Sequence, residues 1–355
     1  MNRSFRDRDY IRTPDNLLFT VIGNVHPKNR VFAYLKYLPN PRGKWGRVGK
    51  RYARSIRYYS ATNIMETVDF LRKRYPQYVY RYEPYQIVFS GVPHKKIAEH
   101  YRPEERLEEL RRAKHPDSLE KRAIELTSFL CEHSGTFIDQ LGVTGSILLN
   151  IHRTFSDIDL TVYGREESHR IKETLLALYE KNSNLVRRLS GSLLLTWCKQ
   201  LSSAHPLNLK EARNLYARIW NKAVFRNTLF SIHPIKIEEE VTEQFGEELY
   251  KPLGVLEARA RVVDASDSCF LPATYFVTDV RFESTGQFDN VQRVVTYEGL
   301  YADIASEGDE IFVRGKLEEV FDSSGRLKYR RILVGSLEAR ASDFIRVVTP
   351  DSAHP

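Results

Sequence analysis

Strand-like segments dominate the first hundred residues of this chain. Residues 17–23, 30–37 and 51–59 are rich in β-branched, aromatic and leucine residues, and a turn over 24–29 that contains Pro27 separates the first two. Residues 62–74 have helical spacing instead, with Ile64, Val68 and Leu71 on one apolar side. The pattern predicts a β-rich first domain over residues 1–100 with one helix.

From Pro103 onward the hydrophobic pattern becomes helical. Residues 104–110 form a charged helix, and a second helix begins at Asp117 or Ser118 and ends before Gly135. An apolar strand over 141–144 runs into a Gly-Ser turn that opens a short helix, and a second strand follows over 156–160. Further helices are expected after Gly164 and over 209–223, and residues 224–238 are strand-like on both sides of Pro234. This alternation defines a second domain over residues 101–254.

The last hundred residues consist of short strands separated by turns. Strands are expected over 256–263, 275–282, 293–300, 310–320 and 327–334, with hairpin turns at 308–309 and 323–325. Five strands in this length fit a small closed barrel, and residues 313–317 resemble a strand of OB-fold proteins. The predicted fold class is therefore α+β, with a third domain over residues 255–355 that is an OB-like barrel.

Composition narrows the class of protein. A hydrophobic fraction of 42% is ordinary for a globular chain, and no apolar run approaches the length of a membrane span. The first six residues have no apolar stretch behind them, so no secretory signal is expected. The three cysteines lie far apart without a CxxC pair, which argues against a disulfide framework and a zinc site. We expect a cytoplasmic protein without membrane partners.

Positive charge is concentrated at the start of the chain. Residues 1–60 contain 14 Lys and Arg against 3 Asp and Glu, whereas residues 255–355 contain 12 against 17. A basic loop over 39–50 contains one aromatic residue, Trp45. We expect four cations of this loop and the first residue of the next strand to bind nucleic acid: Arg42, Lys44, Arg47, Lys50 and Arg51. The alternative is that Tyr and Arg side chains merely cover a half-solvated sheet. The negative barrel argues against a strong phosphate-binding groove there, so a barrel used for protein contacts or for packing on the second domain stays open.

Candidate chemistry lies in the two short strands of the second domain. Asp157 and Asp159 are one residue apart on a strand, so both carboxylates point to the same face and can share divalent cations. Gly145 and Ser146 offer backbone N–H groups and a hydroxyl to a phosphate at a helix N-terminus. A phosphate-binding turn beside paired carboxylates provides the smallest set of groups that two-metal phosphoryl transfer requires.

These residues resemble the nucleotidyltransferase superfamily of DNA polymerase beta type, in which Gly-Ser is followed after a gap by Asp-x-Asp. The resemblance covers residues 141–160 most closely, and the whole chain is similar to an uncharacterised group of archaeal proteins with this domain in the middle. It implies a mixed sheet with helices, two Mg²⁺ ions (or Mn²⁺) and a nucleoside triphosphate whose phosphates lie at Gly145 and Ser146. It also implies a third metal-binding carboxylate, for which Glu238 is the nearest candidate and Glu239 and Glu240 are alternatives.

The function implied is transfer of a nucleoside monophosphate from a nucleoside triphosphate to a hydroxyl, with release of pyrophosphate. The basic first domain and the barrel favour a nucleic-acid acceptor, RNA or tRNA rather than duplex DNA. Two alternatives remain open at this stage. One is a catalytically inactive nucleic-acid-binding protein that uses the same fold as a platform, and the other is a scaffold that binds a protein partner.

Overall fold

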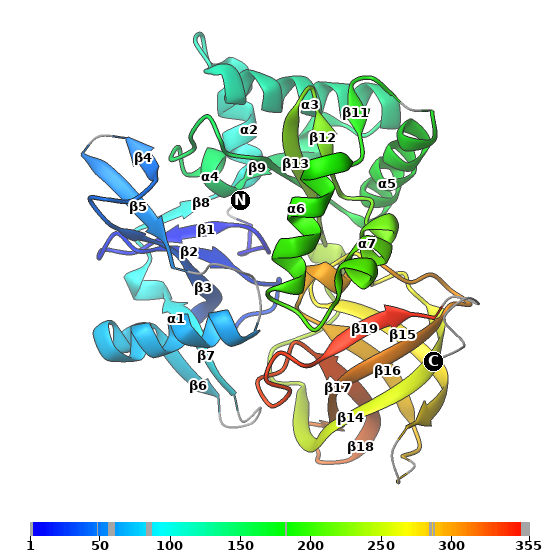
Figure 1. The fold of residues 1–355 in the computed structure, drawn as a ribbon. Helices are drawn as coiled ribbons and strands as arrows, with labels where there is room; N and C mark the ends of the chain where they lie inside the picture. The colour runs from blue at the N-terminus through cyan, green and yellow to red at the C-terminus, as the bar shows by residue number, and fades with distance from the viewer. Residues whose placement is uncertain are drawn as a thin grey trace.

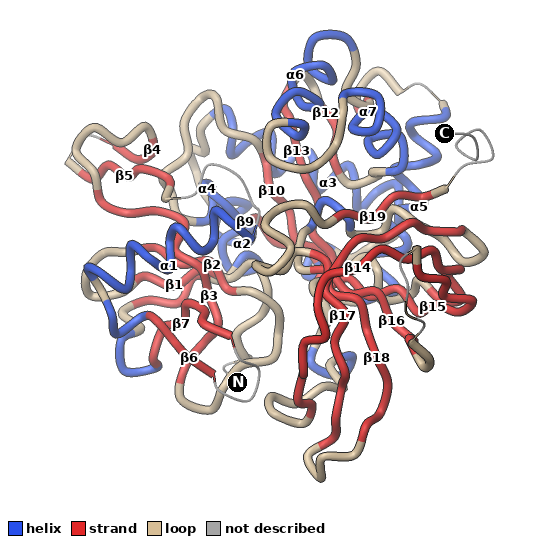
Figure 2. Tube along the Cα trace, turned by 60° about the horizontal axis from the view of Figure 1, so that its bottom comes forward, coloured by secondary structure: helices blue, strands red, loops and turns tan. Residues whose placement is uncertain are grey.

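Three β-sheets follow one another along the chain, and Figures 1 and 2 show them as neighbouring bodies. The computed structural model describes residues 3–47, 49–55, 61–82, 87–181, 183–283, 286 and 288–348. Mixed sheets with helices and a closed barrel confirm the α+β class.

The first sheet is antiparallel, with the strand order β4-β5-β3-β2-β1-β8 and with β7 joining β3 to β6. Its elements are β1 (Tyr10–Arg12), β2 (Leu18–Val21), β3 (Arg30–Pro39), β4 (Trp45–Arg47), β5 (Lys50–Arg54), α1 (Ala61–Arg74), β6 (Val79–Tyr82), β7 (Ile87–Pro93) and β8 (Glu99–Tyr101). The first two expected strands and the helix are confirmed. The third expected strand is shorter, because β5 ends at Arg54, and its residues 56–59 lie outside the described residues.

The second sheet is mixed, with the order β11-β12-β13-β10-β9, and β10 and β13 are its parallel pair. Its strands are β9 (Leu141–Thr144), β10 (Ile158–Tyr163), β11 (Val186–Arg187), β12 (Lys222–Phe225) and β13 (Thr228–Ile235). The helices are α2 (Pro103–Arg112), α3 (Ser118–Ser134), α4 (Gly145–Leu148), α5 (Arg165–Glu180), α6 (Gly191–Ser202) and α7 (Leu209–Arg218). The Asp117 side chain caps α3 and Gly135 ends it with φ 71°, as expected.

Two predictions for this region are wrong. The helix expected over 209–223 ends at Arg218, and the single strand expected over 224–238 is a hairpin of β12 and β13. Arg226 and Asn227 both have positive φ, 44° and 68°, which is the backbone of a tight two-residue hairpin turn. The chain therefore reverses direction before it reaches β13.

The third sheet closes into a barrel in the order β14-β15-β16-β18-β17, because β17 also pairs with β14. Its strands are β14 (Glu248–Asp264), β15 (Ala273–Phe282), β16 (Val291–Thr296), β17 (Glu310–Asp322) and β18 (Leu327–Val334), and β19 (Phe344–Val347) pairs with β17. All five expected strands are present, although the one expected over 293–300 ends at Thr296 and residues 299–301 form a 3₁₀ turn. β14 crosses the expected domain boundary after residue 254, since it begins at Glu248.

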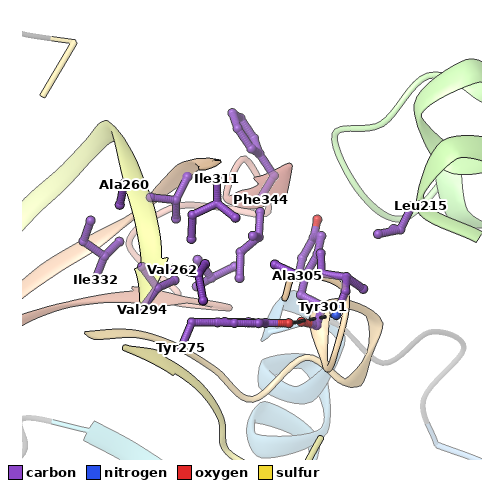
Figure 3. Packing of buried hydrophobic residues seen from close by; sticks show 14 of the residues in the cluster. Leu215, Ala260, Val262, Tyr275, Val294, Tyr301, Ala305, Ile311, Ile332 and Phe344 are labelled. Carbon is purple, nitrogen blue, oxygen red and sulfur yellow. Dashed lines mark hydrogen bonds between the residues drawn. The ribbon is translucent and has the colours of Figure 1, made fainter. Parts of the chain in front are cut away.

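Apolar cores join the three bodies. The barrel core continues into α7, and Figure 3 shows Leu215 facing the Tyr301 and Ala305 side of that core. Within it the Tyr275 hydroxyl donates to the Tyr301 carbonyl at 2.6 Å and accepts from the Ile304 amide at 2.9 Å. A smaller core joins the first sheet to α4 and the loop after it, through Tyr10, Leu18, Tyr37, Tyr52, Leu148, Leu149 and Ile151. This smaller core places the first sheet directly beside the Gly-Ser turn.

Among the described residues, none of the helices combines the length and the apolar character that crossing a bilayer requires.

Candidate active site

Asp159 lies on β10 between two neighbouring strands. It is paired with Thr144 on β9 and with Ser231 on the parallel strand β13, and Asp157 immediately precedes β10. The two carboxylates interact closely, because the charge of Asp159 is the main cause of a raised pKa at Asp157, ahead of burial. The expectation that both acids share one face of the sheet fits this interaction.

Gly145 begins α4 in the left-handed region, with φ 67°. A Cβ atom at this position would lie 2.3 Å from Oδ2 of Asp159, so any side chain would displace the carboxylate. The glycine is therefore required both by its backbone conformation and by the close approach of Asp159. Ser146 is buried directly after it, in a helix of only four residues.

The segment just before β1 contacts the end of β9 through the backbone of Arg8. The Thr144 hydroxyl donates a hydrogen bond to the Arg8 carbonyl at 2.7 Å. Positive side chains surround the acids: Arg54 and Lys222 act on Asp157, and Lys36 acts on Asp159. Two of these three side chains, Arg54 and Lys36, come from the first sheet, so the basic first domain contributes charge to the candidate site itself.

Ser231 and His233 form a hydrogen-bonded row with Asp159. The Ser231 hydroxyl donates to Oδ1 of Asp159 at 2.6 Å and lies 3.0 Å from Nε2 of His233. Since the serine has one proton to give, the network assigns the Nε2 proton to His233, which donates to Ser231. This row occupies the position on β13 where a third carboxylate facing Asp159 would stand.

Burial and charge set the protonation of this row. Burial and the nearby Arg8 charge lower the pKa of His233 to about 4, so the imidazole is neutral at pH 7. Burial opposes ionisation of Asp159, but the interactions with His233 and Ser231 and the charge of Lys36 together hold its pKa well below the usual range. A neutral His233 contributes by hydrogen bonding, not as an ion pair.

Glu238 does not join the two acids. It lies in a short 3₁₀ turn after β13, where it accepts hydrogen bonds from the Ser4 hydroxyl at 2.8 Å and from the Arg6 guanidinium. The last parallel rung pairs Tyr163 with Ile235, and this rung is four residues, or about 13 Å of strand, from Asp159. Glu238 follows three residues after Ile235, beyond the paired part of β13. In this structure the Glu238 carboxylate is bound to Ser4 and Arg6, and its role as a metal ligand stays a prediction.

The neighbouring acids offer no replacement. Glu240 accepts hydrogen bonds from the backbone amides of Arg165 and Ile237, at 2.7 and 3.1 Å, and Glu239 is exposed in the same turn. Within the described ranges, no His, Cys, Asp or Glu completes a group of three ligand atoms around Asp157 and Asp159.

A group that sequence reasoning missed is Asp117, Glu120 and His152, whose ligand atoms lie within 4.8 Å of one another. Its atoms already have partners: Asp117 caps α3 and accepts from Nε2 of His152 at 2.7 Å, while Glu120 binds the Asp117 amide and Arg106. The capping box accounts for this cluster without an ion.

The predicted basic loop forms the β4–β5 hairpin, and its five cations, Arg42, Lys44, Arg47, Lys50 and Arg51, are all exposed. The hairpin is fixed to the loop between α4 and β10. The Gly46 amide donates to the Ile151 carbonyl at 2.7 Å, and the Arg153 guanidinium donates to the Gly46 carbonyl at 3.1 Å. In Figure 1 the hairpin lies beside α4. The basic hairpin is therefore attached to the loop that connects the Gly-Ser turn to Asp157.

Together the fold and the site define an α+β protein with paired carboxylates beside a left-handed glycine on a mixed sheet, flanked by a basic antiparallel sheet and a closed barrel. The chain is 30% identical to uncharacterized protein MJ1086 of Methanocaldococcus jannaschii over 345 residues, which cover 96% of this chain and 98% of that protein. It belongs to the same family as that archaeal protein, which confirms the expected archaeal group. No protein-family model and no solved structure matches the chain. Membership of the polymerase beta-type superfamily stays a prediction.

Proposed function

We propose that this protein is a divalent-metal-dependent nucleotidyltransferase that transfers a nucleoside monophosphate from a nucleoside triphosphate to a hydroxyl of a nucleic acid, with RNA or tRNA favoured. The observation that supports this most strongly is the contact between Gly145 and Asp159. A left-handed glycine against a carboxylate of a paired-acid strand joins the two halves of the resemblance motif in space, although thirteen residues separate them in the sequence.

Asp157 and Asp159 would hold Mg²⁺ or Mn²⁺, which supplies charge neutralisation to the triphosphate and activates the acceptor hydroxyl. The donor set fits a cation, because the two carboxylates stand so close that Asp159 raises the pKa of Asp157. Oxygen ligands of this kind suit hard divalent ions. Among the described residues, two carboxylates are available to hold the two expected ions. Ser231 and His233 lie on β13 where a third carboxylate would face Asp159.

The reaction balances without a covalent enzyme intermediate. The acceptor oxygen bonds to the α-phosphorus, the bond from this phosphorus to the oxygen bridging to the β-phosphate breaks, and pyrophosphate leaves while the hydroxyl proton passes to water. Lys36, Arg54 and Lys222 place positive charge beside the acids, where a triphosphate would carry its negative charge. Catalysis of this kind consists of positioning and charge stabilisation.

A second candidate function is nucleic-acid binding on the same fold without catalysis. The row of Ser231 and His233 favours it, because neither group is an anionic metal ligand in the position facing Asp159. The two functions differ in one measurable property, since a binding protein would not incorporate nucleotide under any metal condition.

The test is incorporation of labelled nucleotides into RNA, tRNA and DNA by the full-length chain with Mg²⁺ or Mn²⁺. We expect transfer that falls by about 10³-fold or more in Asp157→Asn with Asp159→Asn. Transfer that persists undiminished in this double variant would reject the proposal, and no transfer by the native chain to any of the three acceptors would favour the binding function.

Gly145→Ala sharpens this test. Its Cβ would strike Asp159, so we expect loss of metal-dependent transfer and about 1–3 kcal/mol of lost stability. The matched control is Gly135→Ala, because Gly135 has a similar φ of 71° but no atom within 4 Å of the point where a Cβ would lie. The control should share the backbone strain and keep the activity. Equal loss of activity in both variants would contradict a specific role for the Gly145 contact.

A further inference from the structure

An exposed aromatic side chain lies between the two halves of the motif. Phe155 is 62% exposed on the loop from α4 to β10, and its ring is 6.1 Å from that of Trp45 on the basic hairpin, at an interplanar angle of 78°. The edge-to-face arrangement supports the Phe155 ring from one side. The pair joins the two segments that the Gly46 and Ile151 hydrogen bond already fastens together.

Cations surround this aromatic pair. Arg153 is exposed two residues before Phe155, and Arg47 donates to the Asn150 side chain at 3.3 Å from the hairpin side. The Arg54 guanidinium lies 4.7 Å from the Trp45 ring centre and also acts on the charge of Asp157. Arg54 thus connects the aromatic pair to the acids.

The chain itself limits the distance from Phe155 to the acids. Only Ser156 lies between Phe155 and Asp157, so the Cα atoms of these two residues are at most about 7 Å apart. A base that stacks on Phe155 therefore has its own sugar within reach of the candidate reaction centre.

We propose that Phe155, supported by Trp45, stacks the terminal base of a single-stranded nucleic acid whose phosphates follow the cations of the β4–β5 hairpin. This inference rests on the proposed function and names the acceptor class: a single-stranded end. Exposed aromatics interleaved with Arg and Lys bind unpaired bases and backbone together, whereas bases inside a duplex present no free face.

The charges of the hairpin favour an acceptor strand, and not the incoming nucleotide, as the source of the base that stacks on Phe155. Arg42, Lys44, Arg47, Lys50 and Arg51 are spread along both strands of the hairpin and the turn before it. A mononucleotide has only one triphosphate, which the Gly145 and Ser146 turn and the acids would hold. Several separate phosphates are needed to engage a row of cations of this length.

The experiment measures binding of a short fluorescent oligoadenylate RNA to the full-length chain, in EDTA and without nucleotide. We expect Phe155→Ala and Phe155→Leu to weaken binding by about 5- to 100-fold, and Phe155→Trp to retain it. The matched control is Phe137→Ala, since Phe137 is 72% exposed before β9 and is not part of this surface. Duplex RNA of the same length should bind the native chain and Phe155→Ala equally.

Three results would overturn the inference. Native affinity in Phe155→Ala would exclude stacking, and native affinity in Phe155→Leu would show that any apolar side chain serves and that the ring does not stack a base. A loss of nucleoside triphosphate binding in Phe155→Ala equal to its loss of RNA binding would assign the ring to the incoming nucleotide. Because the binding assay needs no transfer, a native chain that binds as expected yet transfers nothing would reject the proposed function alone.

Discussion

The β4–β5 hairpin and the closed barrel are both rich in Arg and Lys, but their cations have different partners. In the barrel, Glu318 binds Lys316 at 2.9 Å and Arg331 at 2.8 Å, and all three side chains are at least 89% buried. In the hairpin, none of the five cations lies within 4.0 Å of a described acid. The two regions therefore differ in how far acids neutralise their cations and not in whether they are basic, and this difference makes the hairpin the better candidate for binding phosphates.

The hairpin and the barrel also differ in how close they lie to the candidate site. The hairpin is fastened to the loop that carries Phe155 and leads to Asp157, whereas the barrel core continues into α7 on another side of the second domain. The distribution of charge along the chain supports the same distinction, since the excess of positive charge lies within residues 1–60. We therefore propose nucleic-acid contact for the hairpin and a structural role for the buried barrel charges.

The largest expected effect tests the barrel. Glu318→Ala leaves Lys316 and Arg331 buried without their common anion, and removing one member of a buried ion pair costs about 3–5 kcal/mol. We expect this loss in urea unfolding of the full chain, with unchanged RNA affinity under conditions where the variant is folded.

Glu257→Ala is the control for this prediction. Glu257 pairs with Arg314 at 2.8 Å, but both side chains are about a third exposed, so at most about 1 kcal/mol should be lost. Equal destabilisation by the two variants, or weaker RNA binding by folded Glu318→Ala, would break the distinction between the two regions.

The second prediction tests the hairpin. Replacing Arg42, Lys44, Arg47 and Arg51 together by Gln should weaken single-stranded RNA binding by about 100-fold at moderate salt. The slope of log affinity against log salt should become shallower by up to about 3, because each lost phosphate contact on a single strand removes about 0.7. Filter binding over a salt series measures both quantities.

The matched variant replaces four exposed barrel cations, Lys251, Arg261, Arg281 and Arg326, by Gln. It changes the net charge by the same amount and should leave the slope within error. A similar loss in both variants would show that RNA responds to total charge and not to the hairpin surface.

Much of the fold could be predicted because the signals are local. The capping box of α3 with Gly135 after it, and the alternation along β14 to β18, are visible over a few residues and fix elements without tertiary information. Helix α6 gave no such signal, since its start has three consecutive leucines, of which Leu193 and Leu195 remain exposed. The β12–β13 turn was missed because Arg226-Asn227 lacks the glycine that usually marks such hairpins.

The candidate site likewise has one part that the local sequence predicted and another part that depends on tertiary packing. Gly145, Asp157 and Asp159 lie within one short segment, so their spacing alone predicted that they meet. Lys36, Arg54, Ser231 and His233 come from distant strands, and only the packing of β13 and the first sheet on this segment brings them there. The position of Ser231 opposite Asp159 was not foreseen, because this register depends on where β13 begins and the β12–β13 hairpin was missed.

The smallest expected effect concerns Glu238, which ties the start of the first domain to the second through Arg6 and Ser4. Burial opposes ionisation, but these two contacts lower the pKa of Glu238 to about 2 from an ordinary value of 4.5. A depressed folded-state pKa contributes stability that is fully present above about pH 4.5 and is lost as the pH falls toward 2.

Because the Glu238 side chain is 40% exposed, solvent screening limits this contribution to at most about 1 kcal/mol. Glu238→Gln should therefore reduce stability slightly at pH 7 and flatten the dependence on pH between 4.5 and 2, as measured by urea unfolding across that range. Transfer activity and Mg²⁺ dependence at pH 7 should not change, since the side chain binds Arg6 and not the acids. Loss of metal-dependent transfer in Glu238→Gln without loss of stability would return this residue to the metal site and require β13 and its following turn to rearrange when substrate binds.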